Sequence, residues 1–156
     1  MHHDESPVEL APGDQAPDFS LPGSDGQTYR LRDLAGQPVV IAWFPKAFTG
    51  GCTAECKSLA TSSGSLRALN ARHFAASVDA PDANAKFAQS LGLDYPILSD
   101  VTKDAARAYG VLAPSGFASR WTFYIGADGR ILDIDKKVSA SSHGPDVLAK
   151  LTDLTS

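Results

Sequence analysis

The two cysteines of this chain lie in one short segment, FPKAFTGGCTAEC, which comprises residues 44–56. Cys52 follows a pair of glycines, and Cys56 stands four positions later. A cysteine attacks an electrophile as its thiolate, whereas an unperturbed thiol, with a pKa of about 8.5, is mostly protonated at neutral pH. A reactive cysteine in this segment therefore needs neighbours that stabilise negative charge on its sulfur.

Cys52 is predicted to lie in the first turn of a helix that follows a buried strand. Residues 39–44, VVIAWF, form an unbroken apolar run, which is typical of a strand buried on both faces. From Thr53 to about Asn70, apolar residues recur near the helical period. The backbone N–H groups of a first helical turn are free, and the helix dipole favours an anion there. This position favours a thiolate at Cys52.

A cationic partner for that thiolate is predicted at Arg120. This arginine stands just before the apolar run WTFYI, which reads as a strand. In a parallel sheet, the end of that strand is expected to lie near the loop that follows residues 39–44. Arg120 would then face the sulfur of Cys52 from a distant part of the sequence.

The reaction that these residues suit is attack on a peroxide, a displacement at oxygen in which negative charge grows on the leaving oxygen. It requires fixed hydrogen-bond donors at that oxygen. The candidates are backbone N–H groups near Gly51 and Cys52, the Arg120 guanidinium and the Thr49 hydroxyl. Pro45 has no N–H and adds an apolar wall that limits water around the sulfur. Taken singly, Pro45 could simply end a strand and Thr49 could be a turn residue.

The pattern P-x-x-x-T-x-x-C, formed by Pro45, Thr49 and Cys52, resembles the active-site motif of peroxiredoxins. Glu55 and the arginine in SRWTFYIGADG fit the same family. From about Leu10 to about Asp135 the chain is similar to peroxiredoxins, most closely to the bacterioferritin-comigratory (Q-type) group of the AhpC-TSA family.

The resemblance implies a thiol peroxidase that reduces hydrogen peroxide and alkyl hydroperoxides and is recycled by thioredoxin or a similar thiol reductant. Cys52 would be the peroxidatic cysteine, which becomes a sulfenic acid. Thr49 and Arg120 would activate it and stabilise the transition state, and Pro45 would shield it. Glu55 would help to hold the arginine, and Gly51 would support the site through its backbone.

Cys56 has two interpretations. It could resolve the sulfenic acid of Cys52 as a disulfide, although resolving cysteines on this helix in Q-type proteins usually stand five positions after the peroxidatic one, where this chain has Lys57. Cβ atoms four residues apart on a helix are roughly 5–6 Å apart, whereas a disulfide holds them about 3.8 Å apart. The first turn must therefore unwind, which Gly50 and Gly51 make possible. Alternatively, Cys56 is a core residue, and the protein is a one-cysteine peroxidase that uses an external thiol.

Two other functions fit less well. A thiol–disulfide oxidoreductase of the same fold would be expected to show C-x-x-C, whereas the spacing here is C-x-x-x-C. A metal-binding module would need two further ligands beside the cysteines, such as His73 and His143, but structural zinc sites usually show tighter ligand pairs. The paired His2 and His3 are more typical of a solvated tail. We predict neither a metal nor a cofactor.

The order of predicted elements indicates an α/β fold. Strands are expected at residues 39–44, 73–79 and 95–100, helices at 53–70, 82–91, 101–111 and 144–154, and hairpins around the turns at 23–26 and 127–129. Gly64 allows a bend or a weak middle in the first helix. Alternating strands and helices imply a largely parallel central sheet between helices, with the last hairpin as an antiparallel edge. This mixed sheet, with its N-terminal hairpin, agrees with the thioredoxin-like fold that the resemblance implies.

Length and composition limit the remaining possibilities. The 156 residues suit a flexible tail at 1–9 and one domain at 10–156. A net charge of −4 argues against nucleic acid as a partner, and no apolar run approaches the ~20 residues that span a bilayer. Two cysteines without an export signal favour a reducing compartment, the cytoplasm. We expect a monomer or a weak homodimer.

Overall fold

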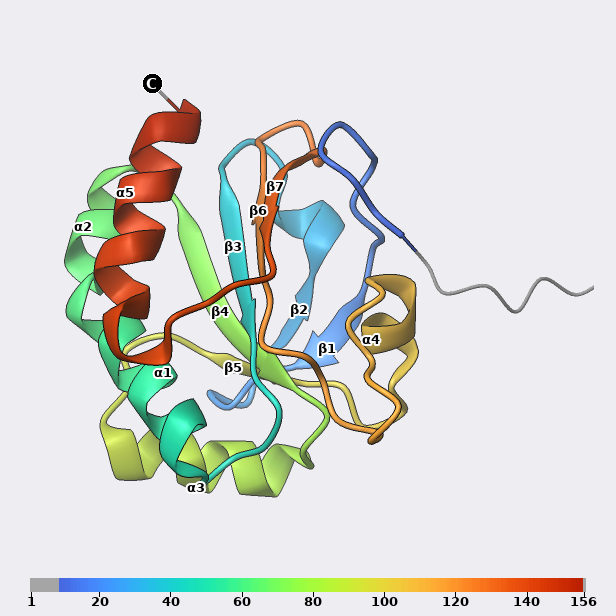
Figure 1. Cartoon of the computed structure of the whole chain (residues 1–156), viewed down its shortest axis with the longest axis vertical. Coiled ribbons are helices and arrows are strands. Elements are labelled where there is room, and N and C mark those ends of the chain that lie inside the picture. The colour runs from blue at the N-terminus through green and yellow to red at the C-terminus, as the bar shows by residue number, and fades with distance from the viewer. Residues whose placement is uncertain (1–8, 156) are drawn as a thin grey trace, which may run out of the picture.

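A five-stranded mixed sheet forms the centre of the computed structural model, which describes residues 9–155 (Figure 1). Its strands are β3 (Val39–Trp43), β4 (Arg72–Ser77), β5 (Ile97–Ser99), β6 (Thr122–Ile125) and β7 (Ile131–Asp135). They lie in the order β5-β4-β3-β6-β7, in which β3, β4 and β5 are parallel and β6 is antiparallel to both β3 and β7. The predicted mixed sheet is confirmed, but β6 is an internal strand rather than part of an edge hairpin.

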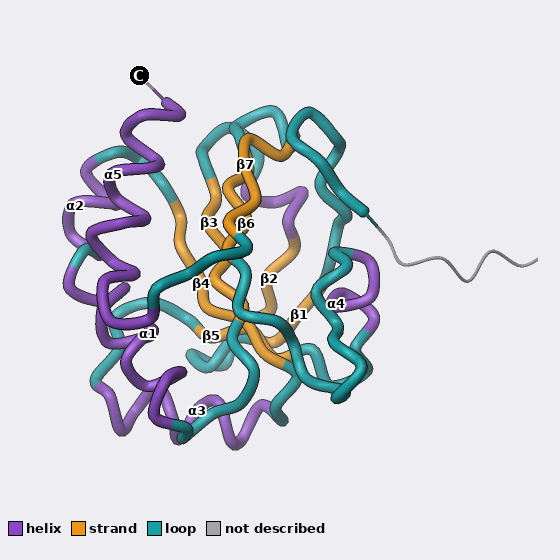
Figure 2. Tube along the Cα trace, viewed as in Figure 1, coloured by secondary structure: helices purple, strands orange, loops and turns teal. Residues whose placement is uncertain are grey.

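Helices and a hairpin cover the two faces of this sheet (Figures 1 and 2). One face packs against α1 (Gly50–Thr61), α2 (Ser63–Ala68), α3 (Pro81–Leu91) and α5 (His143–Thr155). The other packs against the hairpin of β1 (Ser20–Pro22) and β2 (Thr28–Arg30), the short 3-10 helix η1 (Leu31–Leu34) and α4 (Asp104–Ala108). A second 3-10 turn, η2 (Ala140–Ser142), precedes α5.

Strand β3 contributes to both cores because its side chains alternate between the two faces. Val39, Ile41 and Trp43 join the core beneath the hairpin, whereas Val40 and Ala42 join the core beneath the helices. All five residues of β3 are buried, as predicted for a strand covered on both sides. None of the helices in residues 9–155 combines the length and apolar character that crossing a bilayer requires.

The single helix predicted at residues 53–70 is in fact two helices, and the first begins earlier, at Gly50. The chain leaves the helical path at Ser62, which has a ψ of 4°. The next residue, Ser63, is buried and its hydroxyl lies 2.9 Å from Nε2 of His73 on β4. This contact of Ser63 with the sheet lies at the break, whereas Gly64, where the sequence allows a bend, is an exposed residue within α2.

The C-terminal half of α1 is fixed by a close approach to α5. The Gly144 N–H donates to the Ser58 hydroxyl at 2.9 Å. A Cβ atom at residue 144 would lie only 1.9 Å from the Ser58 carbonyl oxygen, so that only glycine fits there. This contact does not include the first turn of α1.

Of the tail predicted at residues 1–9, the structure describes only Glu9. His2 and His3 lie outside the described residues.

Candidate active site

The antiparallel pairing of β3 and β6 brings Arg120 to the loop before α1. Ala42, near the end of β3, pairs with Thr122 at the beginning of β6, and the Trp43 N–H donates to the Trp121 carbonyl at 2.9 Å. In a parallel pair, Arg120 would instead lie near Val39, at the opposite end of β3. Arg120 therefore lies near the loop before α1, as predicted. The parallel pairing that we expected to bring it there is wrong.

Arg120 bridges Cys52 and Glu55. Its Nη2 lies 3.6 Å from the Cys52 Sγ, and its Nη1 donates to the Glu55 Oε1 at 2.6 Å. The Glu55 side chain is 1% exposed and that of Arg120 is 25% exposed. A guanidinium is a rigid fork of donors, so that one nitrogen can be held by the carboxylate while another faces the sulfur.

The end of the helix adds free backbone N–H groups next to Cys52. Cys52 is the third residue of α1 and is 1% exposed. The first intrahelical bond runs from the Thr53 N–H to the Thr49 carbonyl at 2.9 Å. The N–H groups of Gly51 and Cys52 therefore have no acceptor within the helix. These groups, the helix dipole and the guanidinium all favour negative charge at this position.

The side chain of Glu55 is buried, which disfavours its negative charge. Burial raises its pKa to about 7, although the pairing with Arg120 acts in the opposite direction. Its second oxygen, Oε2, is buried without a hydrogen-bond partner. Glu55 therefore changes its charge near neutral pH, next to the arginine that faces Cys52.

The raised pKa of Glu55 predicts a pH dependence of stability. Between pH 4.5 and about 7 the folded chain keeps a proton that the unfolded chain loses, so this contribution is present at low pH and is lost as the pH rises through about 7. Relative to Glu55→Gln, the wild type should lose about 2–3 kcal/mol of free energy of unfolding between pH 4 and 8. Urea unfolding of both proteins across this range measures the difference, and a constant difference would contradict the prediction.

The two other motif residues lie in the loop between β3 and α1. Pro45 is partly buried, and Thr49 is exposed. The Thr49 hydroxyl donates to the Lys46 carbonyl at 2.7 Å. Its proton is thus already in use, whereas its oxygen lone pairs remain able to accept a hydrogen bond.

Cys56 lies in the core of the reduced protein. Both thiols are free, and Cys56 is 1% exposed within the apolar cluster that includes Leu59 and Leu66. Burial raises the pKa of its thiol far above the ordinary range. The Tyr95 hydroxyl donates to the Cys56 carbonyl at 2.6 Å, which fixes this turn of the helix. In this conformation Cys56 packs as a core residue.

Sequence reasoning missed two residues that hold the loop before α1. The Asp79 carboxylate accepts the Ala47 N–H at 2.9 Å, and Phe48 has a φ of 66° with its ring packed on Phe87. Asp79 stands next to Ala80-Pro81, and the sequence reads there as the start of a helix. Its long-range contact leaves no local pattern in the sequence.

The four ligands of the alternative metal site are not brought together. His73 contacts Ser63 and the ring of Tyr95, whereas His143 lies 3.4 Å from the Thr122 hydroxyl. Among residues 9–155, no group of three or more potential ligands is arranged to hold a metal ion. Burial lowers the pKa of both histidines to about 4.

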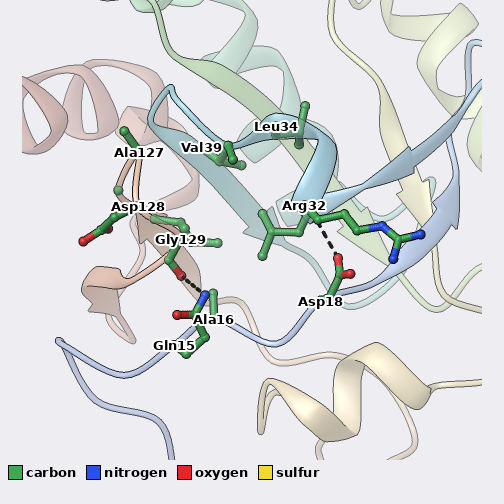
Figure 3. A pocket seen from close by; sticks show the side chains of 13 residues that line it. Gln15, Ala16, Asp18, Arg32, Leu34, Val39, Ala127, Asp128 and Gly129 are labelled. Atoms are coloured by element: carbon green, nitrogen blue, oxygen red, sulfur yellow. Dashed lines mark hydrogen bonds between the residues drawn. The ribbon is translucent and has the colours of Figure 1, made fainter.

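A cavity of about 340 Å³ lies at the opposite end of β3 from Cys52. Figure 3 shows residues that line it, among them Val39, Arg32 and Gly129. The amide of Gln15 donates to the Gly129 carbonyl at its edge. None of the predicted catalytic residues lines this cavity.

Comparisons with known proteins agree with the geometry around Cys52. The model of the AhpC/TSA family matches residues 12–134. The peroxiredoxin Bcp of Escherichia coli K12 is 33% identical over 146 residues, which cover 89% of this chain and 94% of that protein. The peroxiredoxin Bcp of Bacillus subtilis is 30% identical over 150 residues, or 92% of this chain and 96% of that protein.

Solved structures show the same relationship. The crystal structure of peroxidoxin BcpB from Mycobacterium tuberculosis has a TM-score of 0.85 and 32% identity, covering 95% of this chain and 100% of that one. The bacterioferritin comigratory protein of Xanthomonas campestris also has a TM-score of 0.85, with 25% identity, covering 97% of this chain and 100% of that one. These proteins share a thioredoxin-like fold. The chain belongs to the AhpC/TSA family and is a peroxiredoxin of the Bcp (Q-type) group.

Proposed function

We propose that Cys52 is the residue through which this peroxiredoxin, a thiol peroxidase, reduces its substrates. The observation that carries this assignment is the Arg120 guanidinium 3.6 Å from the Cys52 Sγ, at the first turn of α1. The thiolate attacks the terminal oxygen of a hydroperoxide. A sulfur–oxygen bond forms as the O–O bond breaks, the departing oxygen takes up a proton from solvent and leaves as water or an alcohol, and Cys52 becomes a sulfenic acid.

Each neighbour of Cys52 then has a defined role. Arg120 and the free N–H groups of the first turn stabilise the charge that develops on the leaving oxygen. Thr49 accepts a hydrogen bond from the substrate O–H, because its own proton is donated to the Lys46 carbonyl. Pro45 shields the sulfur from water. This role of Thr49 differs from the donor role expected from the sequence.

We further propose that Cys56 resolves the sulfenic acid. Its thiol condenses with the sulfenic acid, releasing water and leaving a Cys52–Cys56 disulfide, which thioredoxin or a similar reductant then reduces. The first turn of α1 must unwind for this step, since the two thiols belong to one intact helix and Cys56 is buried. That burial also favours the second candidate, a one-cysteine peroxidase that uses an external thiol.

Mass spectrometry of the intact protein distinguishes these two mechanisms. After one equivalent of peroxide, a Cys52–Cys56 disulfide lowers the mass by two hydrogens. A sulfenic acid that persists raises it by one oxygen. We expect the loss of two hydrogens, and persistence of the added oxygen would show that Cys56 is a core residue.

The family and the site support proposals on the substrates, the partner and the location. Family membership supports a peroxide substrate and a thiol reductant such as thioredoxin. The related Xanthomonas campestris protein has alkyl peroxide reduction activity, and we expect alkyl hydroperoxides beside hydrogen peroxide here. The two free thiols suit the cytoplasm. Few large apolar side chains among residues 9–155 are exposed (Phe48, Val101 and Phe117), which suits a monomer or weak homodimer.

Gly51 is expected to be necessary because of the space that Arg120 occupies. A Cβ atom at residue 51 would lie 2.9 Å from the Arg120 Nη2, and Glu55 prevents the guanidinium from moving away freely. Gly51→Ala should therefore slow the reaction with peroxide about tenfold, although alanine favours the helix. Gly50→Ala is the matched control, because nothing lies within 4 Å of a Cβ at that position. Stopped-flow fluorescence measures both rates, and equal effects of the two substitutions would contradict the prediction.

A further inference from the structure

The carboxylate of Asp79 holds the loop that precedes the reactive helix. Its Oδ2 accepts the Ala47 N–H at 2.9 Å, although the two residues are 32 positions apart. Asp79 does not cap α3, whose N-cap is Ala80 and has no side-chain hydrogen bond. Asp79 is thus committed to the loop of residues 44–49, which connects β3 to the first turn of α1.

A buried chain of polar side chains fixes Asp79 in turn. The Ser77 hydroxyl donates to the Asp79 Oδ2 at 2.8 Å. The Asn84 amide on α3 lies 2.9 Å from the hydroxyls of both Ser77 and Ser99. Ser77, Asn84 and Ser99 are each at most 2% exposed. A buried network that is fully hydrogen-bonded is rigid, so that β4, β5 and α3 together place the Asp79 carboxylate.

Phe48, the residue after Ala47, also contacts α3, but its backbone conformation is unfavourable. Phe48 has a φ of 66°, which is strained for a residue other than glycine. Its side chain is 58% exposed, and its ring lies 5.1 Å from that of Phe87, one turn beyond Asn84 on α3. Departure of the loop relieves this strain. The hydrogen bond from Ala47 to Asp79 acts against that departure.

We propose that Asp79 is a positioning residue that holds residues 44–49 in the conformation that presents Cys52 to peroxide and must release them before a Cys52–Cys56 disulfide can form. This inference rests on the proposed roles of the two cysteines. The loop leads directly into the turn that unwinds, whereas the later part of α1 stays fixed by Gly144 and Tyr95. One hydrogen bond thus affects the two chemical steps in opposite directions.

The test measures the two steps separately in Asp79→Ala. In a Cys56→Ser background, where only the first step occurs, the rate constant for attack on hydrogen peroxide should fall about tenfold, as expected for loss of a hydrogen bond to a charged group. With Cys56 present, conversion of the sulfenic acid to the disulfide should become several times faster. Less sulfinic acid should then accumulate at high peroxide, which intact mass reports. Asp82→Ala, which removes a nearby exposed carboxylate, should change neither rate.

Opposite changes in the two rates are the signature of a hold on the loop, because a substitution that only disturbed the attack on peroxide would leave disulfide formation unchanged. Asp79→Asn keeps an acceptor oxygen without the charge and should give smaller changes of the same signs, and it decides the matter if Asp79→Ala does not fold. Two unchanged rates, or two reduced rates, would overturn the proposal. If the wild type forms no Cys52–Cys56 disulfide, the resolving role of Cys56 is wrong. The proposal that Asp79 must release residues 44–49 is then wrong as well. The Cys56→Ser measurement still decides whether Asp79 positions the loop for attack.

Discussion

Peroxidase activity is expected to disappear in Cys52→Ser, with a loss of at least about 10³-fold in the rate of peroxide consumption. A serine hydroxyl is not ionised at neutral pH, so the arginine and the helix end would have no anion to stabilise. The fold should be retained, since serine has nearly the size of cysteine and its hydroxyl would lie beside the Arg120 guanidinium and the free N–H groups of the first turn. Peroxide consumption with dithiothreitol as reductant measures the loss. If the protein were instead a thiol–disulfide oxidoreductase, even the wild type would consume peroxide slowly.

Cys56→Ser is the matched variant for that experiment. With thioredoxin in place of dithiothreitol, it should consume one equivalent of peroxide at the wild-type rate and then stop, because the sulfenic acid of Cys52 has no internal partner. Since Cys56 is 1% exposed in an apolar cluster, the serine hydroxyl should also lower the free energy of unfolding by about 1–3 kcal/mol. Full thioredoxin-dependent turnover in Cys56→Ser would show that the resolving role is wrong.

The parts of the fold that the sequence predicts well are those that depend on neighbouring residues. The apolar run at 39–44 predicts β3, which is buried on both faces. The Asp128-Gly129 dipeptide predicts the turn between β6 and β7, where Gly129 has a φ of 82° that favours glycine. In both cases a local pattern is sufficient, because burial on two faces and a tight turn each restrict which residues can follow one another.

The parts that the sequence does not predict depend on how distant segments pair. Local patterns give β6 and β7 as a hairpin, but not that β6 lies beside β3 or that it runs antiparallel to it. The break at Ser62 accompanies a contact between Ser63 and His73 on a strand that follows later in the chain. The role of Asp79 likewise arises from a residue that is distant in sequence. Thus Cys52 and Thr49 are found from one motif, whereas the network behind the loop is visible only in three dimensions.

Arg120→Met is the second substitution with a large expected effect. It removes the donor that lies 3.6 Å from the Cys52 Sγ, and we expect the rate constant for attack on peroxide to fall about 10²- to 10³-fold. Stability should change less than for most buried ion pairs. Glu55, with a pKa of about 7, can take up a proton when its partner is absent. Glu55→Gln in the same protein should then restore stability without restoring the rate.

Arg120→Lys shows whether charge alone is sufficient. A lysine keeps the positive charge, but its single ammonium group cannot hold the Glu55 carboxylate and face the sulfur through two separate nitrogens, as the guanidinium does. We therefore expect Arg120→Lys to recover only part of the rate, leaving it at least about tenfold below the wild type. Stopped-flow measurements on the reduced proteins compare the three side chains directly. If Arg120→Met reacted with peroxide at a rate within threefold of the wild-type rate, the guanidinium would not stabilise the transition state. Stabilisation of negative charge on the sulfur would then depend on the helix end alone.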